Sequence, residues 1–534
     1  MHMPEENGAT VSALPLAPLP AAVEELDGAP FLVTTSTPVT GEGDAVAELH
    51  RILALLVDDV EPAAAAAAAA AAESTPPGIR LVIEAGGPSE SYTLDARADG
   101  VRVTGADAAG LFYGVQTLAQ LIAARGGARI VPAVRIADAP RFAYRGVMLD
   151  VARHFPGVDT VKAFIDRAAS LKFNVLHLHL TDDQGWRLEI ASRPLLAERA
   201  SSSAVGGDPG GRFTQADYAE IVAYAASKHM TVVPEIDMPG HTHAVSLAYP
   251  ELSEQPVLSD HIRETVRDHG GSLPQNGVAY DGMAVGFSSL RIHDEATYEF
   301  VADVLREVAE LTPGPYLHIG GDEALGTPAE DFARFMTRVS GMVADLGKTP
   351  VAWHEAGAAP GLHPSTVGQY WGFVTPVDDA GERARAFVTH GSKVVLSPAD
   401  AIYLDMKFDA DSPLGLTWAR GVTSAQRAYE WDAAAIVEGI GDDDILGVEA
   451  PLWTETVRDL ADIDALAFPR IAAAAEAAWS PPLGTTPART WDSFRLRVGG
   501  LAPLWSASGI GFTRLPEIAW ADTSTSPERE VRTA

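Results

Sequence analysis

The chain has 534 residues, of which 72 are Asp or Glu and 39 are Lys or Arg, giving a formal net charge of −33. Nucleic acids and anionic membrane surfaces bind proteins mainly through clusters of Lys and Arg. We therefore expect no nucleic-acid partner and no membrane partner, and a neutral or cationic partner fits better. The chain contains no Cys, which excludes disulfides, thiol nucleophiles and Cys metal sites.

Residues 1–26 are rich in Ala, Pro and Glu without a sustained period, and they predict a flexible N-terminal lead. The stretch "MHMPEENGAT" lacks a basic region followed by an apolar core. We therefore expect a cytoplasmic location for the chain as given, and a secreted protein if a native signal has been trimmed. No uncharged apolar run approaches the ~18 residues of a membrane helix.

Residues 27–138 predict a small α/β domain. Its strands are "FLVTTS", "GIRLVIEAG" and "SYTLDARADGVRVTGA", and its helices are "GEGDAVAELHRILALLV" and "DAAGLFYGVQTLAQLIAA". A run of alanines at 63–72 interrupts these elements. Because alanine favours helix, we expect this run either to extend a helix or to form a surface segment. Its lack of polar atoms argues against a chemical role.

The segment "IADAPRFAYRG" around Pro140 marks the start of a larger unit, residues 139–512. Short apolar strands there alternate with amphipathic helices, from "GVMLDVA" through "NVLHLHL", "MTVVPEI" and "PYLHIGG" to "ILGVEAPLW". Eight strands in strict alternation predict a (β/α)8 TIM barrel, so the predicted fold class is α/β, a small α/β domain followed by the barrel. Residues 513–534 are expected to form a C-terminal tail.

Catalytic groups of such a barrel follow the carboxyl ends of its strands. At each of these ends the chain carries an acid, an Arg, a His or an aromatic residue. A single Asp could cap a helix and a single Trp could fill the core, but together they suit a sugar, because carboxylates accept from hydroxyls and indole faces stack on pyranose rings. These residues are Asp150, Arg153, His179, Asp182, Asp183, Asp237, His241, Asp322, Glu323, Trp353, Trp371, Tyr403, Asp405, Trp453 and Glu455.

The stretch "LHIGGDEALG" places Asp322 and Glu323 side by side. Glycosidic cleavage commonly uses two carboxyl groups several Å apart. Successive side chains of a strand point to opposite faces, so both acids can reach one substrate only if the chain leaves the regular strand there. Gly320 and Gly321 permit such a turn.

Eight longer motifs follow in order: "RGVMLDVARHF", "LHLHLTDDQGWRLEI", "PEIDMPGHT", "HIGGDE", "VAWHE", "QYW", "YLDMKF" and "APLWTE". Together they resemble the family 20 glycoside hydrolases, the β-N-acetylhexosaminidases, from about residue 142 to 479. Residues 31–138 resemble the small domain that precedes the barrel in bacterial members. The resemblance implies an exo-acting, retaining enzyme whose nucleophile is the substrate's own acetamido oxygen, with an oxazolinium intermediate.

The resemblance also implies the partners of the protein. The substrate would be an oligosaccharide or glycoconjugate with a terminal, non-reducing, β-linked N-acetylglucosamine or N-acetylgalactosamine. No cofactor and no metal would be needed. Chitin fragments, glycan termini and cell-wall pieces stay open as natural substrates, and so does the oligomeric state.

The residues that match the family's motifs take roles from the resemblance. Glu323 would protonate the glycosidic oxygen and later activate water, which needs a raised pKa. Asp322 would accept a hydrogen bond from the acetamido nitrogen and stabilise the positive charge that develops there. Tyr403 would hold the acetamido oxygen, and Asp182 and His241 would form a relay behind Glu323. The residues expected to wall or bind the sugar are Trp353, Trp371, Trp453, Arg153, Asp405 and Glu455.

Two other interpretations stay open at this point. A metal-dependent barrel hydrolase would use the pairs His177 with His179 and His241 with His243, because two His at i and i+2 can share a metal. A catalytically inactive sugar-binding protein would need the aromatic and acidic residues but not both adjacent acids. The polar segment 254–282 after the third strand could shape the site of the leaving sugar or be a solvated excursion.

Overall fold

The computed structural model describes residues 14–41, 43–57, 77–125 and 128–522. The chain forms two compact units: Phe142–Ala474 is one, and Met1–Arg141 together with Ala475–Ala534 is the other. The alanine run at 63–72 lies outside the described residues. None of the described helices is long and apolar enough to cross a membrane.

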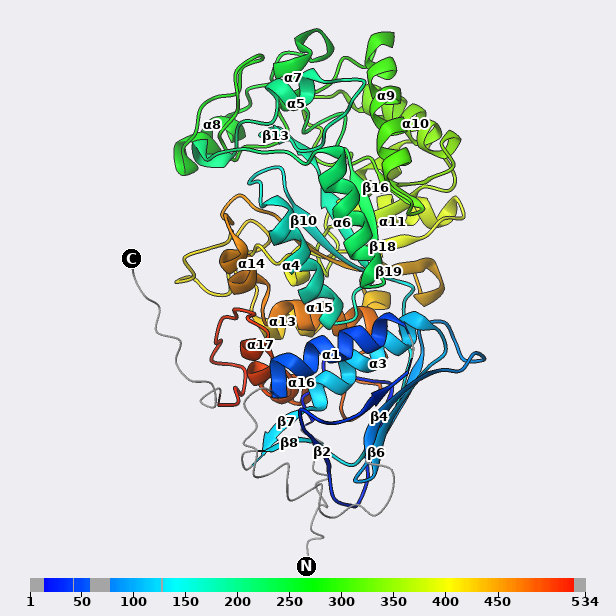
Figure 1. Cartoon of the computed structure of the whole chain (residues 1–534). Helices are drawn as coiled ribbons and strands as arrows, with labels where there is room; N and C mark the ends of the chain where they lie inside the picture. Colours follow the sequence, from blue (N-terminus) through cyan, green and yellow to red (C-terminus); the bar gives the residue numbers. More distant parts are fainter. Residues whose placement is uncertain (1–13, 42, 58–76, 126–127, 523–534) are drawn as a thin grey trace, which may run out of the picture. The chain divides into compact units, whose positions relative to one another are not determined.

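The unit Phe142–Ala474 is built on a closed barrel of eight parallel strands (Figure 1). The last strand pairs with the first, so the barrel has no open edge. This arrangement confirms the predicted (β/α)8 barrel. Its strands are β10 (Tyr144–Asp150), β11 (Val175–His179), β14 (Thr231–Glu235), β15 (Tyr316–His318), β16 (Thr349–Trp353), β17 (Val367–Tyr370), β18 (Val394–Leu396) and β19 (Ile445–Leu452).

Amphipathic helices follow the strands and surround the barrel (Figure 1). In α9 the buried residues Val301, Val304 and Val308 recur every three or four positions, which is the period of one helix face. Helix α6 begins at a capping box in which Thr214 and Asp217 bond each other's backbone N–H groups. The longer helices are α4 (Gly157–Ser170), α6 (Gln215–Ser227), α9 (Glu295–Leu311), α10 (Ala329–Asp345), α11 (Ala380–Thr389), α14 (Leu460–Ala467) and α15 (Arg470–Trp479).

Two layers of different chemistry fill the interior of the barrel. The layer near the start of the strands is apolar, and the next layer along the strands is polar. The two layers are two residues apart on a strand, because alternate residues of a strand point inward. The apolar layer contains Tyr144, Val175, Val233, Val351, Val367 and Val395. The polar layer contains the fully buried side chains His177, Glu235, His318, Gln369 and Glu449.

The other unit contains the predicted small α/β domain. Helices α1 (Asp44–Val57) and α3 (Ala108–Leu121) pack against each other, and α3 covers the neighbouring strand β6. Asp107 caps α3 by accepting from the N–H of Gly110. The six-stranded sheet is ordered β1 (Ala22–Glu25), β9 (Val134–Asp138), β5 (Tyr92–Arg97), β6 (Gly100–Gly105), β4 (Gly78–Ile83), β3 (Val39–Thr40). A three-stranded sheet is ordered β2 (Phe31–Val33), β8 (Ala128–Val131), β7 (Ala123–Arg125).

The prediction of a flexible lead over 1–26 is wrong for residues 14–26. Strand β1 pairs antiparallel with β9, and the side chains of Leu16 and Leu19 are buried. Ala17 N donates to Gln120 Oε1 at 3.0 Å, and Gln120 Nε2 donates back to Ala17 O at 2.6 Å. These partners lie more than 100 residues away, so the local sequence carries no periodic signal for them. Residues 1–13 lie outside the described residues.

The predicted limits of the barrel domain, 139–512, also differ from the structure, in which that unit ends at Ala474. Helices α16 (Trp491–Gly499) and α17 (Ala502–Ala507) belong to the other unit. Within that unit, buried Glu476 pairs with Arg497 at 2.7 Å, and Arg497 donates to the carbonyl of Leu16. Through this hydrogen bond, Arg497 links α16 to the segment around Leu16 within the same unit.

The predicted C-terminal tail, 513–534, is described as far as residue 522. In this part Leu515 and Ile518 are buried, so it packs as part of its unit instead of extending from it. Residues 523–534 lie outside the described part of the chain.

Candidate active site

A cavity of about 770 Å³ opens at the carboxyl ends of the barrel strands. This volume lies in the range of roughly 300–1,000 Å³ that is usual for small-molecule sites. Seven of the predicted site residues line it: Arg153, Asp322, Glu323, Trp371, Tyr403, Trp453 and Glu455.

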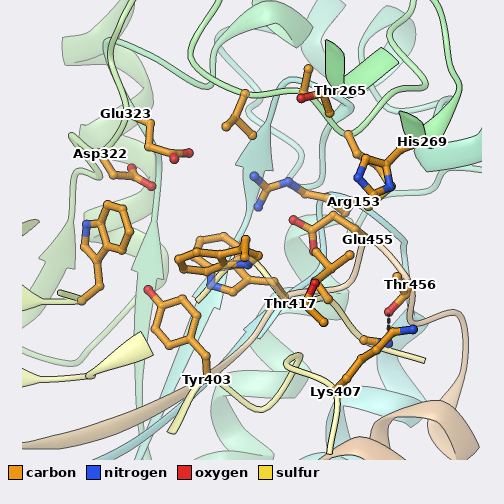
Figure 2. Close-up of a pocket in the computed structure, with 18 of the residues that line it drawn as sticks. Arg153, Thr265, His269, Asp322, Glu323, Tyr403, Lys407, Thr417, Glu455 and Thr456 are labelled. Atoms are coloured by element: carbon orange, nitrogen blue, oxygen red, sulfur yellow. Dashed lines mark hydrogen bonds between the residues drawn. The ribbon is translucent and has the colours of Figure 1, made fainter. Parts of the chain in front are cut away.

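The backbone after β15 brings both neighbouring acids to the cavity. Gly320 and Gly321 have φ angles of 65° and 102°, and Glu323 has a φ of 42°, so the chain leaves the strand here. A side chain at Gly320 would come within 1.7 Å of Asp237 Oδ1, and the N–H of Gly321 donates to the same oxygen at 3.0 Å. Figure 2 shows the result: Asp322 and Glu323 lie on one wall of the cavity.

The carboxyl of Glu323 has the electrostatics of a general acid. Burial raises its pKa to about 7, with a further contribution from Asp322, while His241 and Arg153 act in the opposite direction. The side chain keeps 36% of its surface exposed, and it faces the cavity, so a ligand can reach it. An acid with a pKa near neutrality can donate a proton and later accept one at the same pH.

His241 and Asp182 stand behind Glu323. His241 Nδ1 lies 3.2 Å from Asp182 Oδ1, and its Nε2 lies 3.7 Å from Glu323 Oε2 and 3.8 Å from Asp322 Oδ2. Burial lowers the pKa of His241, but the charges of Asp182 and Asp322 outweigh burial and hold this pKa well above its ordinary value. A cationic imidazole therefore lies between the inner carboxylate and the two acids of the cavity.

Aromatic rings form another wall of the cavity. Trp371, Tyr403 and Trp453 line it, and the ring centroids of Tyr403 and Trp453 are 6.4 Å apart. Trp353 was predicted to wall the sugar as well, but it is fully buried and packs behind Trp453, with centroids 6.1 Å apart. The reason is its indole N–H, which turns inward and donates to Glu235 Oε1 at 2.8 Å. Trp353 supports the wall from behind.

Arg153, Glu455 and Asp405 offer the polar groups expected for sugar hydroxyls. The guanidinium of Arg153 lies 2.8 Å from Asp182 Oδ2 and 4.8 Å above the ring of Trp453. Within the described part of the chain, Glu455 Oε2 and both carboxylate oxygens of Asp405 are buried without a hydrogen-bond partner. Asp405 lies behind the lining residues, where burial and the charge of Glu455 raise its pKa well above the ordinary value. Buried carboxylate oxygens seldom lack partners, so Glu455, which lines the cavity, can offer its free oxygen to a ligand.

A third acid, Glu355, lies next to the pair and was not predicted from the sequence. It follows β16 by two residues and accepts from Trp371 Nε1 at 2.9 Å. Burial, with a smaller contribution from Asp322, raises its pKa to about 8, so it is protonated at neutral pH. Its position directly after a strand end, in "VAWHE", was the signal that could have found it.

A series of buried charged side chains, also not predicted from the sequence, leads from the barrel interior to the site. Glu449 Oε1 lies 2.8 Å from His177 Nδ1, and His177 Nε2 lies 3.1 Å from Glu235 Oε2. Glu235 Oε2 lies 2.6 Å from His179 Nδ1, and His179 Nε2 lies 2.7 Å from Asp182 Oδ2. All five residues are fully buried. Acids within apolar strands, as in "VVPEI" and "GVEAPL", are the sequence signal for this series.

The imidazoles that suggested a metal site have other partners. Both ring nitrogens of His177 and of His179 face carboxylates, and His243 Nε2 lies 2.9 Å from the carbonyl of Val278. Several sets of three side chains, each made of His with Asp or Glu, place ligand atoms within 4.8 Å of one another among the described residues. Hydrogen bonds and ion pairs within these sets already explain their packing, so the metal-dependent alternative is not favoured.

The segment 254–282 contributes to the cavity through helix α8 (Asp260–His269). His261, Thr265 and His269 stand four residues apart, on one face of this helix, and all three line the cavity. Figure 2 shows Thr265 and His269 on the side away from Asp322 and Glu323. The segment therefore shapes the mouth of the site.

A (β/α)8 barrel with a high-pKa acid, a neighbouring carboxylate and an aromatic wall at its mouth defines a glycoside hydrolase. Residues 142–331 and 325–482 match the model of glycosyl hydrolase family 20, catalytic domain, and residues 13–139 match domain 2 of the same family. The chain belongs to glycosyl hydrolase family 20.

Known relatives match nearly the whole chain. A beta-N-acetylhexosaminidase of Cellulomonas fimi is 38% identical over 517 residues, which cover 96% of this chain and 98% of that protein. The solved structure of a glycoside hydrolase family 20 beta-N-acetylglucosaminidase has a TM-score of 0.86 at 60% identity, covering 95% of this chain and 100% of that one. A mutant Streptomyces plicatus beta-hexosaminidase in complex with its product GlcNAc has a TM-score of 0.82 at 42% identity, covering 96% and 98%.

Proposed function

We propose that the protein is an exo-acting β-N-acetylhexosaminidase that removes terminal, non-reducing N-acetylglucosamine or N-acetylgalactosamine by retaining, substrate-assisted hydrolysis. The observation that carries this proposal is the placement of Asp322 and Glu323 on one cavity wall, with Glu323 lying 3.7 Å from His241 and holding a pKa of about 7. Two adjacent carboxylates on one wall are badly placed to flank an anomeric carbon as acid and nucleophile. The acetamido group of the substrate then supplies the nucleophile.

The reaction follows from these positions. Glu323 gives its proton to the glycosidic oxygen as the bond to the anomeric carbon breaks, and the acetamido oxygen attacks that carbon to form an oxazolinium ring. Asp322 accepts the acetamido N–H and stabilises the positive charge on the ring. The Glu323 carboxylate then takes a proton from water, which opens the ring and restores the β configuration. A tethered nucleophile is already oriented, which lowers the entropic part of the barrier.

The remaining groups position the terminal sugar. Tyr403 holds the acetamido oxygen against the aromatic wall, and Arg153, Asp405 and Glu455 bind the outer hydroxyls. Fully buried Trp353 packs behind Trp453 and supports the aromatic wall. Membership of glycosyl hydrolase family 20 supports exo action on oligosaccharides and glycoconjugates.

A non-catalytic sugar-binding role is less well supported. Binding alone gives no reason for an acid whose pKa is raised to about 7 to stand beside a buried relay. Catalysis does give a reason, because a general acid works best when its pKa lies near the working pH.

The proposal is tested by following the hydrolysis of 4-nitrophenyl N-acetyl-β-glucosaminide and its galacto epimer by ¹H NMR. We expect the β-anomer of the free sugar to form first, followed by slow mutarotation. If the α-anomer of the free sugar formed first, retention would be contradicted. If neither epimer released free sugar, the proposed activity itself would be contradicted.

A further inference from the structure

Glu235 is an acid in a part of the barrel that other proteins fill with apolar side chains. It is the last residue of β14, it is fully buried, and it stands two residues after Val233 of the apolar layer. A buried carboxylate is costly unless it is paired and hydrogen-bonded. The reaction proposed above does not bring Glu235 into contact with the substrate.

One oxygen of Glu235 holds the aromatic wall. Oε1 accepts the indole N–H of Trp353 at 2.8 Å, and Trp353 packs against Trp453. His318 Nδ1 lies 3.1 Å from the same oxygen, but this nitrogen accepts the N–H of Gly320 at 3.0 Å and so has no proton to donate. The indole is therefore the donor to this oxygen.

The other oxygen fixes the charge of His179. His179 Nδ1 lies 2.6 Å from Glu235 Oε2, and its Nε2 lies 2.7 Å from Asp182 Oδ2. A ring nitrogen must carry a proton to bond a carboxylate, so a histidine between two carboxylates is protonated on both nitrogens. The electrostatics agree, because Glu235 and Asp182 overcome the effect of burial and hold the pKa of His179 well above its ordinary value.

The contacts from Glu235 through His179 to Asp182, called the arm below, continue to the general acid, Glu323. The second oxygen of Asp182 lies 3.2 Å from His241 Nδ1, and His241 Nε2 lies 3.7 Å from Glu323 Oε2. We propose that Glu235 is a positioning residue for the reaction: it holds His179 as an imidazolium and thereby fixes Asp182 and His241 for proton transfer by Glu323. This inference rests on the proposed function.

Glu449 offers a matched control inside the same barrel. It is equally buried, and its carboxylate is bonded by Tyr144 at 2.5 Å, by His177 at 2.8 Å and by Gln369 at 2.7 Å. In the described part of the chain, the ion pairs that connect it to Glu235 run through His177. Replacing either acid by Gln removes one buried negative charge, but only Glu235 bonds directly to the arm that ends at Glu323.

The test compares Glu235→Gln and Glu449→Gln on a series of aryl N-acetyl-β-glucosaminides with good and poor leaving groups. Only poor leaving groups need protonation, and Gln still offers an oxygen to Trp353. We expect Glu235→Gln to lower kcat on the poor leaving group about tenfold to a hundredfold, which is part of the roughly 10²–10⁴-fold that a general acid contributes. The dinitrophenyl substrate should change little, KM should change less than kcat, and Glu449→Gln should show no dependence on the leaving group.

The pH profile gives a second signature. Without Glu235, His179 loses the carboxylate that holds its second proton, so the variant loses one buried negative charge and one buried positive charge, while His177 keeps its contact with Glu449. His179 stands nearer to Glu323 along this series of contacts than Glu235 does, so the lost positive charge has the larger effect and the protonated form of Glu323 is favoured. The alkaline limb of kcat/KM should therefore move to higher pH in Glu235→Gln. Neutral His318, anionic Asp182 and the guanidinium of Arg153, which lies 3.4 Å from His179 Nε2, also face this region and are present in both proteins, so they do not account for a shift.

Equal losses of Glu235→Gln on good and poor leaving groups, or a profile identical to that of Glu449→Gln, would overturn the inference. If Glu235→Gln does not fold, His179→Gln should show the same dependence on the leaving group. ¹⁵N-histidine NMR of the unaltered protein needs no variant of Glu235: a neutral His179 ring at pH 6 would overturn the inference by itself. A wild-type protein inactive on every aryl N-acetylhexosaminide would instead remove the proposed function.

Discussion

The two ends of the barrel strands are buried alike and yet differ in chemistry. At the amino ends, side chains such as Val175, Val233 and Val367 fill the interior. Two residues later the same strands carry His177, Glu235 and Gln369, also fully buried. Apolar burial stabilises the fold by itself, whereas a buried charge needs partners to be tolerated. Burial alone therefore does not identify the functional end of this barrel, whereas buried charged side chains do.

Glu323→Gln, at the carboxyl ends of the strands, should reduce activity more than any other substitution considered. Loss of the proton donor should lower kcat/KM roughly 10²–10⁴-fold on aryl N-acetyl-β-glucosaminides with poor leaving groups, and far less on activated ones. The exposed Glu330→Gln on α10 is the matched control and should leave both rates unchanged. An equal loss of Glu323→Gln on all leaving groups would count against the acid role.

Asp322→Asn should follow in size. It removes the charge that stabilises the oxazolinium ring, and we expect a loss of roughly 10²–10³-fold, as for other preorganised electrostatic contacts. Because this contact is made to the acetamido group, the loss should be similar for good and poor leaving groups. Near-normal rates on any N-acetylated substrate would contradict the proposed contact.

A substitution in the apolar layer should change the free energy of unfolding and leave the activity nearly unchanged. Val395→Ala deletes buried methyl groups from the apolar layer and should destabilise the barrel unit by about 1–3 kcal/mol. Urea unfolding measures this change, and kcat on the folded protein should stay within a factor of two of the wild type, on the order of 0.4 kcal/mol in activation free energy. A loss of kcat as large as that of Glu323→Gln would erase the distinction between the two ends.

Glu355 should make the stability of the protein depend on pH. Its pKa of about 8 lies above its ordinary value of 4.5, so between these pH values the native state holds a proton that the unfolded state has lost. Stability from this group is therefore fully present below about pH 4.5 and falls as the pH rises to about 8. The melting temperature of the wild type should fall more steeply from pH 5 to pH 8 than that of Glu355→Gln. Parallel curves would show that Glu355 is not protonated in the native protein.

Much of the fold and part of the site could be predicted from sequence because both depend on a local pattern. Short apolar strands alternating with amphipathic helices specify the barrel, and the residues after the strands, such as Arg153, Tyr403 and Glu455, come together at one mouth for geometric reasons alone. The turn at Gly320 could likewise be predicted, because only a departure from the strand lets two adjacent acids share a wall.

What could not be predicted depends on partners that are distant in sequence. Glu235 is tolerated inside the barrel because His179 and Trp353 come from other strands, and nothing near Glu235 in the sequence shows them. The same bond turns Trp353 inward, away from the sugar it was expected to wall. Strand β1 was missed for a similar reason, since its partner β9 lies more than 100 residues further along the chain.

The central claim is that the substrate supplies the nucleophile. It is tested most directly by comparing kcat/KM on two aryl β-glycosides that differ only at C2, one with the acetamido group and one with a hydroxyl. A well-oriented internal nucleophile has a large effective concentration, so we expect the acetamido substrate to react more than about 10³-fold faster. Equal rates on the two substrates would contradict the account, because Asp322 and Glu323 would then be acting as an ordinary carboxylate pair.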